Sequence, residues 1–160
     1  MTDRATRVVA TADEMRDLGA SLGRTARAGD VIVLTGDLGA GKTTLTQGIA
    51  RGLGIAEQVT SPTFVISRVH ANPSGGPVLV HADAYRLGSV REVDDLDLEQ
   101  DLEAGVVVVE WGSGLVDDLS ESVVHVVITR TDDEADETRV VEVVAADERW
   151  ADAVGSGEGT

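Results

Sequence analysis

Several residue types that carry structure or chemistry in other proteins are absent or rare in this chain of 160 residues. It contains no cysteine, which excludes disulfides, thiolate nucleophiles and cysteine-based zinc sites. No apolar run approaches the roughly 18 residues that would span a membrane, and the N-terminus lacks the apolar stretch of a signal peptide. We therefore expect a soluble, cytoplasmic protein. The four aromatic residues are Phe64, Tyr85, Trp111 and Trp150, so we expect an aliphatic core.

Positive charge is also scarce. The chain has 13 Lys and Arg against 29 Asp and Glu, which gives a formal net charge of −16. Such a surface repels phosphate backbones and anionic lipid, so we expect no membrane contact and no direct grip on nucleic acid. A basic protein partner fits this charge, although the acidic residues could serve solubility alone. Residues 94–103, an acidic run, have the same two interpretations: a solvated face or a docking surface.

The length suits a single domain, and neither a linker nor an internal repeat divides it. We predict one domain over residues 1–153, followed by a disordered tail over residues 154–160. Residues 11–30 predict an amphipathic helix that Thr11 caps, with Glu14 three residues on and Gly29 at its end. Further helical segments are expected near residues 42–54, 89–105 and 147–154. Apolar runs predict strands at residues 31–35, 64–70, 78–83, 106–110, 122–130 and 139–145.

These elements predict an α/β protein with a mixed sheet. The strands that begin near Val31, Val78 and Val106 are expected at its centre, and two antiparallel hairpins would flank them. Residues 64–70 and 78–83 would form one hairpin around a flexible loop, "ANPSGGP". Residues 122–130 and 139–145 would form the other.

A glycine-rich segment between the first predicted strand and the next helix carries the clearest chemistry. "GDLGAGKT", residues 36–43, matches the phosphate-loop pattern G-x-x-x-x-G-K-[ST]. Its glycines let backbone N–H groups converge on an anion, the helix dipole adds positive potential, and the Thr43 hydroxyl can bind Mg²⁺. Lys42 is the one lysine of the chain, against twelve arginines, and it stands where a compact ammonium meets β- and γ-phosphates. The alternative is a glycine-rich helix start with a surface lysine.

Two carboxylates end apolar runs, Asp83 in "VLVHAD" and Glu110 in "VVVVE". Both would lie at the C-terminal edge of the sheet, where open α/β sheets bind ligands. Spacing alone does not decide which of them touches the metal, and either could instead cap the next segment. His81 is compatible with an ordinary hydrogen-bonded core histidine, and the three histidines share no zinc-like spacing.

Missing motifs narrow the class of nucleotide-binding protein. The chain has no N-K-x-D element for guanine, and only Arg86 and Arg91 follow Asp83 where small kinases carry an arginine-rich lid. The pattern favours a small adenine-nucleotide switch or ATPase with a P-loop NTPase-like three-layer sandwich. A small-molecule kinase and a nucleotide-gated adaptor remain the alternatives.

Four motifs in order, "GDLGAGKTT", "SPTF", "HADAYRL" and "VEWG", resemble the TsaE family, and the resemblance runs from about Thr11 to Ala145. It implies an ATPase required for N6-threonylcarbamoyladenosine at position 37 of tRNAs that read codons beginning with A. It also implies TsaB and TsaD as protein partners, with ATP hydrolysis resetting their complex and tRNA contacted only through them.

The resemblance assigns roles residue by residue. It implies that Lys42 contacts the β- and γ-phosphates, that Thr43 and Glu110 bind Mg²⁺, and that Asp83 acts on the attacking water or the metal's water shell. Thr63, within the switch-like residues 61–64, would sense the γ-phosphate. The implied ATP-binding residues are Thr11, Gly36, Asp37, Leu38, Gly39, Ala40, Gly41, Lys42, Thr43, Thr44 and Trp111. The aromatic Phe64, Tyr85 and Trp111, and Arg86, would lie near the nucleotide or a partner, although an aromatic could also simply fill a gap at the sheet edge.

Overall fold

A computed structural model describes seven stretches of the chain, and every structural statement below concerns them. They are residues 3–36, 41–55, 67–83, 105–110, 123–130, 138–145 and 149–155. Their strands are β1 (Asp3–Val9), β2 (Val31–Gly36), β3 (Ser67–His70), β4 (Val78–Asp83), β5 (Gly105–Glu110), β6 (Val123–Arg130) and β7 (Arg139–Ala145). Their helices are α1 (Ala12–Thr25), α2 (Lys42–Leu53) and α5 (Arg149–Gly155).

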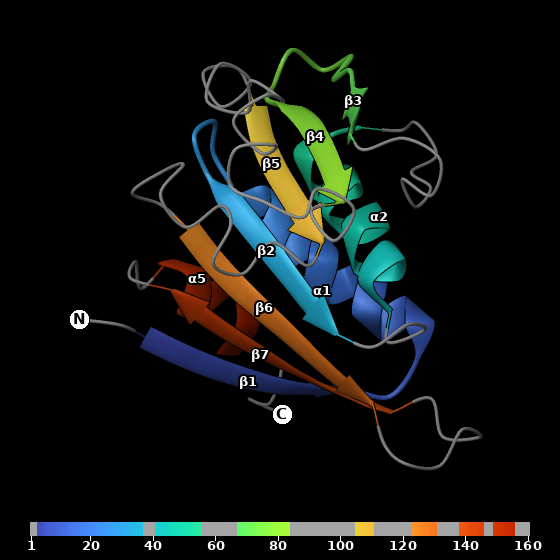
Figure 1. Ribbon diagram of the computed structural model, residues 1–160, viewed down its shortest axis with the longest axis vertical. Helices are drawn as coiled ribbons and strands as arrows, with labels where there is room; N and C mark the ends of the chain where they lie inside the picture. The colour runs from blue at the N-terminus through green and yellow to red at the C-terminus, as the bar shows by residue number, and fades with distance from the viewer. Residues whose placement is uncertain are drawn as a thin grey trace.

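The strands form one mixed sheet in the order β1-β7-β6-β2-β5-β4-β3 (Figure 1). Strands β6, β2, β5 and β4 are mutually parallel, whereas β1–β7, β7–β6 and β3–β4 are antiparallel pairs. The predicted mixed sheet with a parallel centre and two antiparallel hairpins is therefore confirmed. The strands expected at the centre, β2, β5 and β4, are adjacent and parallel, and β6, predicted only as half of a hairpin, also pairs in parallel with β2.

Strand β1 was not predicted from the sequence. Of its side chains, Val9 is buried, whereas Val8 is 62% exposed and polar residues occupy much of the remainder. A strand with so little apolar patterning gives a weak local signal. Pairing along its whole length with β7, from Asp3 opposite Ala145 to Val9 opposite Arg139, supplies the hydrogen bonds that hold it in place.

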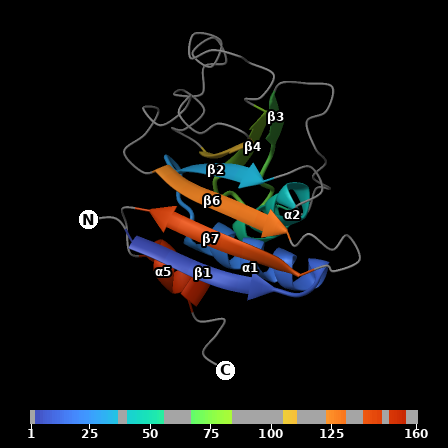
Figure 2. The ribbon, with the colours of Figure 1, turned by 60° about the horizontal axis from the view of Figure 1, so that its bottom comes forward.

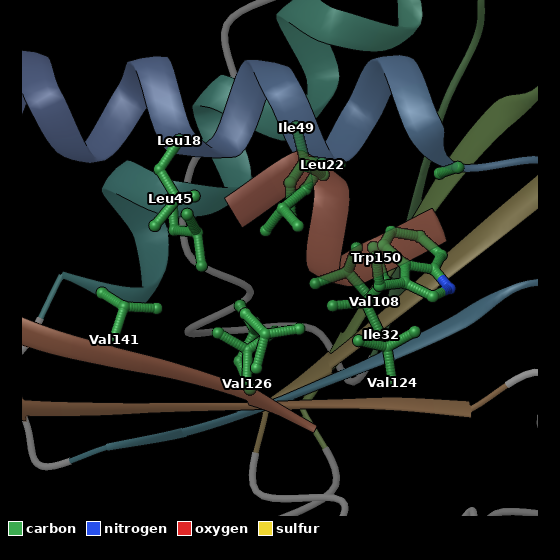
Figure 3. Close-up of a cluster of buried hydrophobic side chains, with 14 of the residues drawn as sticks. Leu18, Leu22, Ile32, Leu45, Ile49, Val108, Val124, Val126, Val141 and Trp150 are labelled. Atoms are coloured by element: carbon green, nitrogen blue, oxygen red, sulfur yellow. The ribbon is translucent and has the colours of Figure 1, made fainter. Parts of the chain in front are cut away.

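The described helices lie on one face of the sheet, where they enclose a core that is aliphatic, as predicted, apart from Trp150 (Figure 3). Figure 2 shows α1 and α5 together beneath the end of the sheet that β1 and β7 form. The core side chains drawn in Figure 3 include Leu18, Leu22, Leu45, Ile49 and Trp150 from the helices, and Ile32, Val108, Val124, Val126 and Val141 from the strands. Strands β2 and β5 are buried on both faces, as their continuous apolar runs predicted. Of the helical pieces predicted at residues 89–105, residues 89–104 lie outside the described residues, and Gly105 begins β5 instead.

Helix α1 begins with the predicted cap. Thr11 Oγ1 accepts a hydrogen bond from the Glu14 N–H at 3.1 Å, and the Glu14 carboxylate accepts one from the Ala10 N–H. The helix ends at Thr25 rather than at Gly29. The chain turns earlier because the Asp30 carboxylate accepts a hydrogen bond from the Arg27 N–H at 2.6 Å and stabilises a tight turn. Gly29, with φ of +100°, occupies that turn.

Helix α5 is tied to the start of β2 by a partly buried ion pair. Arg149 Nη2 lies 2.7 Å from Asp30 Oδ1, and Arg149 Nη1 donates to the Thr25 carbonyl at 2.7 Å. Val154, within the same helix, is fully buried. The folded part therefore extends to Gly155, beyond the boundary predicted at residue 153. Residues 156–160 lie outside the described part.

The loop at residues 71–77 is organised by one side chain. Asn72 Nδ2 donates to the carbonyl of Leu53 at 2.8 Å and to that of Pro77 at 2.9 Å. Asn72 Oδ1 accepts from the Ser74 N–H at 2.9 Å. These bonds join the loop, expected to be flexible, to the C-terminal end of α2.

No helix in the described stretches is long and apolar enough to cross a bilayer.

Helices α1 and α2 approach so closely that their contact admits no side chain at four glycines. A Cβ atom at any of them would lie 2.1–2.3 Å from a backbone oxygen of the other helix. The four glycines and the residues carrying those oxygens are Gly19 (Leu45), Gly23 (Ile49), Gly48 (Arg16) and Gly52 (Ala20). The partner positions rise together along both helices, so the helices are parallel and their N-termini lie at the same end. This contact places Thr11 at the end where α2 begins.

Replacing Gly48 by alanine is expected to lower the free energy of unfolding by about 2 kcal/mol. Its Cβ would lie 2.2 Å from the Arg16 carbonyl oxygen, and backbone atoms do not yield as a side chain does. Overpacking destabilises a core by about 1–3 kcal/mol, and this backbone contact belongs at the upper end of that range. Alanine has a higher helix propensity than glycine, which offsets about 1 kcal/mol of this loss. Urea unfolding measures the difference. Gly75→Ala is the control, since no atom lies within 4 Å of its Cβ position and only its positive φ opposes the change. Equal stability of Gly48→Ala and the wild type would contradict the close contact.

Candidate functional site

Three parallel strands end at one edge of the sheet and bring the predicted site residues together. Glu110, at the end of β5, is paired in register with Leu34 of β2 on one side and with Asp83 of β4 on the other. Adjacent strands lie about 4.8 Å apart, so Asp83 and Glu110 are backbone neighbours. Strand β2 continues to Gly36, the first residue of the phosphate-loop motif. The prediction that both acids lie at this edge is confirmed for their backbones.

The loop ends are held in a conformation that requires glycine. Gly41, the residue before α2, has φ of +113°, a left-handed conformation that side chains disfavour. A Cβ there would also lie 3.2 Å from Met15 Cε of α1. The glycine that the motif demands next to the lysine is therefore needed for its backbone angle, whereas the flexible end of the Met15 side chain would have to move only a few tenths of an ångström.

Lys42 is the first residue of α2 and is 7% exposed. Its Nζ donates a hydrogen bond to the Gly36 carbonyl at 2.6 Å, so the ammonium links the start of α2 to the end of β2. A surface lysine, the alternative considered from the sequence, would not be enclosed in this way. An ammonium has three protons, so Lys42 can keep this bond and still donate to phosphate oxygens.

Glu110 is almost buried, at 7% exposure, and it is paired with a histidine. Its Oε2 lies 2.7 Å from Nε2 of His81, which is fully buried. Both side chains point toward the helix-covered face, because Val108 and Leu79, two residues earlier on their strands, belong to the core on that face. The sequence interpretation left open whether His81 is an ordinary core histidine, and it gave His81 no role at the site. A signal was available in its position two residues before Asp83, on the strand predicted to end beside Glu110.

The remaining predicted residues fall into two groups. Thr43 and Thr44 follow Lys42 in the first turn of α2 and are half-buried, and Thr11 caps α1 at the same end of the helix pair. The other predicted residues lie outside the described part of the chain, which leaves their roles as predictions. They are Asp37, Leu38, Gly39, Ala40, Thr63, Phe64, Tyr85, Arg86 and Trp111.

The oxygen donors at this edge suit Mg²⁺. The Glu110 carboxylate and the Thr43 hydroxyl are hard oxygen ligands of the kind this ion prefers. Within the described stretches, no three or more His, Cys, Asp or Glu side chains form a cluster that could hold a metal ion. Mg²⁺ commonly uses one or two protein ligands and takes the rest from phosphates and water, so this small donor set fits a nucleotide-dependent magnesium site.

Known proteins resemble this chain over most of its length. A protein from Streptomyces coelicolor named tRNA threonylcarbamoyladenosine biosynthesis protein TsaE is 54% identical over 141 residues, which cover 87% of this chain and 95% of that protein. A protein of the same name from Mycobacterium tuberculosis is 45% identical over 128 residues, or 76% of each chain.

The fold is also found in a solved structure. The crystal structure of YdiB from Bacillus subtilis superposes with a TM-score of 0.70 and 30% identity, and the match covers 96% of this chain and 93% of that one. A family model described as threonylcarbamoyl adenosine biosynthesis protein TsaE matches residues 9–141. That span includes the phosphate loop, His81, Asp83 and Glu110, and together with the identity to the Streptomyces protein it shows that the chain belongs to the TsaE family.

Proposed function

We propose that this chain is a Mg²⁺-dependent ATPase that acts in the formation of N6-threonylcarbamoyladenosine in tRNA. The observation that carries the proposal is the enclosed Lys42 ammonium, 2.6 Å from the Gly36 carbonyl, at the sheet edge that also presents Glu110. Membership of the TsaE family supports the assignment to this pathway.

Different described residues would contact the phosphates and the Mg²⁺ of the nucleotide. The N–H groups at the start of α2 and the Lys42 ammonium attract the β- and γ-phosphates, since both present positive charge to one point. Thr43 and Glu110 would hold Mg²⁺, which when bound neutralises charge on the phosphate oxygens. Helix α1 packs against α2 through glycines, and this contact places Thr11 at the end where α2 begins.

Hydrolysis further requires a group that orients the attacking water. We assign this role to Asp83, because its backbone pairs with Glu110 at the same edge and a carboxylate can accept a proton or hydrogen bond from water. Thr63 is the proposed sensor of the γ-phosphate, as the family resemblance implies.

The cellular role follows from the relatives. The Streptomyces and Mycobacterium proteins carry the name of the tRNA threonylcarbamoyladenosine pathway, and this chain spans nearly the whole length of the former. We infer that ATP hydrolysis here resets a complex of TsaB and TsaD between turnovers at position 37 of tRNAs that read codons beginning with A. A net charge of −16 supports contact with these proteins rather than with tRNA itself.

The test is ATP turnover by the full chain alone and then with TsaB and TsaD from the same organism. We expect a low basal rate that rises sharply with the pair, because a partner that supplies a missing charge can change phosphoryl transfer by several orders of magnitude. A rate indifferent to the pair would overturn the coupling. Transfer of labelled γ-phosphate to a metabolite would instead indicate a kinase. A hydrolysis-dead variant that binds ATP and still supports many rounds of tRNA modification would indicate a nucleotide-gated adaptor.

A further inference from the structure

The buried pair of His81 and Glu110 joins two neighbouring parallel strands 29 residues apart in sequence. Strand β4 is hydrogen-bonded on one side to β3 and on the other to β5, with His81 opposite Arg68 and Val108. Its imidazole is fully buried, so its ring is held by backbone pairing and by packing. Glu110, by contrast, has three rotatable side-chain bonds and retains some exposure at the sheet edge.

The contact defines the hydrogen-bonding state of the imidazole. A contact of 2.7 Å needs one proton between the two atoms, and an ionised carboxylate can only accept, so we assign that proton to Nε2. The opposite ring nitrogen, Nδ1, is buried and has no hydrogen-bond partner in the structure's described part. The one hydrogen bond of the ring that the described residues show therefore goes to Glu110.

One oxygen of the Glu110 carboxylate is therefore hydrogen-bonded to His81, and the other remains able to bind a ligand. Oε2 is occupied by His81, and the described residues show no hydrogen bond to Oε1. A carboxylate anchored through one oxygen has fewer orientations for the second. Hydrogen bonds from neighbouring groups orient metal-binding carboxylates in this way.

We propose that His81 is a positioning residue: its Nε2–H fixes the Glu110 carboxylate so that Oε1 meets the Mg²⁺ of a bound Mg–nucleotide. The inference rests on the proposed function, in which Glu110 is a magnesium ligand. It adds that the affinity for Mg²⁺, rather than the affinity for the nucleotide alone, depends on His81, a residue that contacts neither the ion nor the nucleotide.

The experiment measures Mg²⁺ affinity directly. Binding of a non-hydrolysable ATP analogue to the full chain is followed by calorimetry without Mg²⁺ and over a series of Mg²⁺ concentrations. His81→Leu keeps an apolar side chain of moderate size and removes the donor. We expect the Mg²⁺ midpoint, the concentration that gives half of the Mg²⁺-dependent gain in analogue affinity, to rise about 10–100-fold, the usual loss when such a supporting hydrogen bond is removed. The affinity for the analogue without Mg²⁺ should stay unchanged.

A matched pair of polar variants keeps the test valid if His81→Leu does not fold. In His81→Gln the terminal amide can reach the place of Nε2, so we expect Mg²⁺ affinity near that of the wild type. In His81→Asn the amide is too short to reach Glu110, so we expect the same loss as in His81→Leu. A general effect of the core would not separate glutamine from asparagine in this order.

Two further variants identify the route of the effect. In a Glu110→Gln background, His81→Leu should cause no additional loss, because the histidine acts through that carboxylate. His70→Leu is the control: His70 is also fully buried, but it pairs with Leu79, four residues before the end of β4. We expect it to change stability without changing the Mg²⁺ midpoint.

The outcomes distinguish a failure of the role of His81 from a failure of the proposed Mg²⁺-dependent ATPase function. If the wild type binds the analogue without any dependence on Mg²⁺, the proposed magnesium site fails and the role of His81 fails with it. If the wild type depends on Mg²⁺ but His81→Leu and His81→Asn match it, the positioning role is overturned and the ATPase assignment stands.

Discussion

Replacing Asp83 by alanine is expected to leave ATP bound and to lower its turnover by about 10²–10⁴-fold, the range that a positioned acid–base group contributes. Asp83 ends β4 directly beside Glu110 in the register of the sheet. If Glu110 holds the metal, the neighbouring acid is available for the attacking water. Loss of that acid should slow the chemical step and spare the phosphate contacts, which come from the loop and from Lys42.

Single-turnover kinetics and calorimetry separate these two effects. Asp83→Asn should behave like Asp83→Ala, because it keeps the size and removes the charge. Glu142→Ala is the control, since Glu142 lies on β7, far across the sheet from β4. Glu110→Ala should instead weaken the Mg²⁺-dependent part of binding, which decides which acid contacts the metal. Normal turnover in Asp83→Ala would end the assignment of this residue to catalysis.

Replacing Lys42 by alanine is expected to weaken ATP binding about 100-fold and to abolish measurable turnover. A hydrogen bond to a charged group contributes about 1.5–3 kcal/mol, and the enclosure of Lys42 favours the upper end of that range. Since about 1.4 kcal/mol corresponds to a factor of ten, 3 kcal/mol gives the expected loss. The loss in turnover should be larger still, because negative charge on the phosphoryl oxygens is redistributed in the transition state.

The control for Lys42→Ala is Arg51→Ala, which removes one positive charge from the exposed last turn of the same helix. It should leave ATP affinity within about twofold of the wild type, because solvent and salt screen a distant surface charge. Lys42→Arg should not restore function, since a planar guanidinium does not replace a compact ammonium at this place. Unchanged ATP affinity of Lys42→Ala in calorimetry would contradict the phosphate-loop assignment.

Features encoded by neighbouring residues were predicted well. The Thr11 cap, the continuous apolar strands β2 and β5 and the end of α2, predicted near Gly52 or Gly54 and found at Gly54, depend on side chains and backbone angles within a few residues. The prediction was wrong at the end of α1, where the Asp30 turn overrides the helix, and it missed β1. Both errors arise where a hydrogen bond or strand pairing outweighs local propensity.

The sequence by itself determined the phosphate loop, because the chemistry of that loop is written in consecutive residues from Gly36 to Thr43 and needs no distant partner to be recognised. It also placed Asp83 and Glu110 at strand ends. Only the tertiary structure decided that β6 and β5 flank β2, that α1 and α2 lie parallel through facing glycines, and that His81 holds Glu110. These arrangements join residues far apart in the chain, and strand order and register, which local pattern does not encode, bring them into contact.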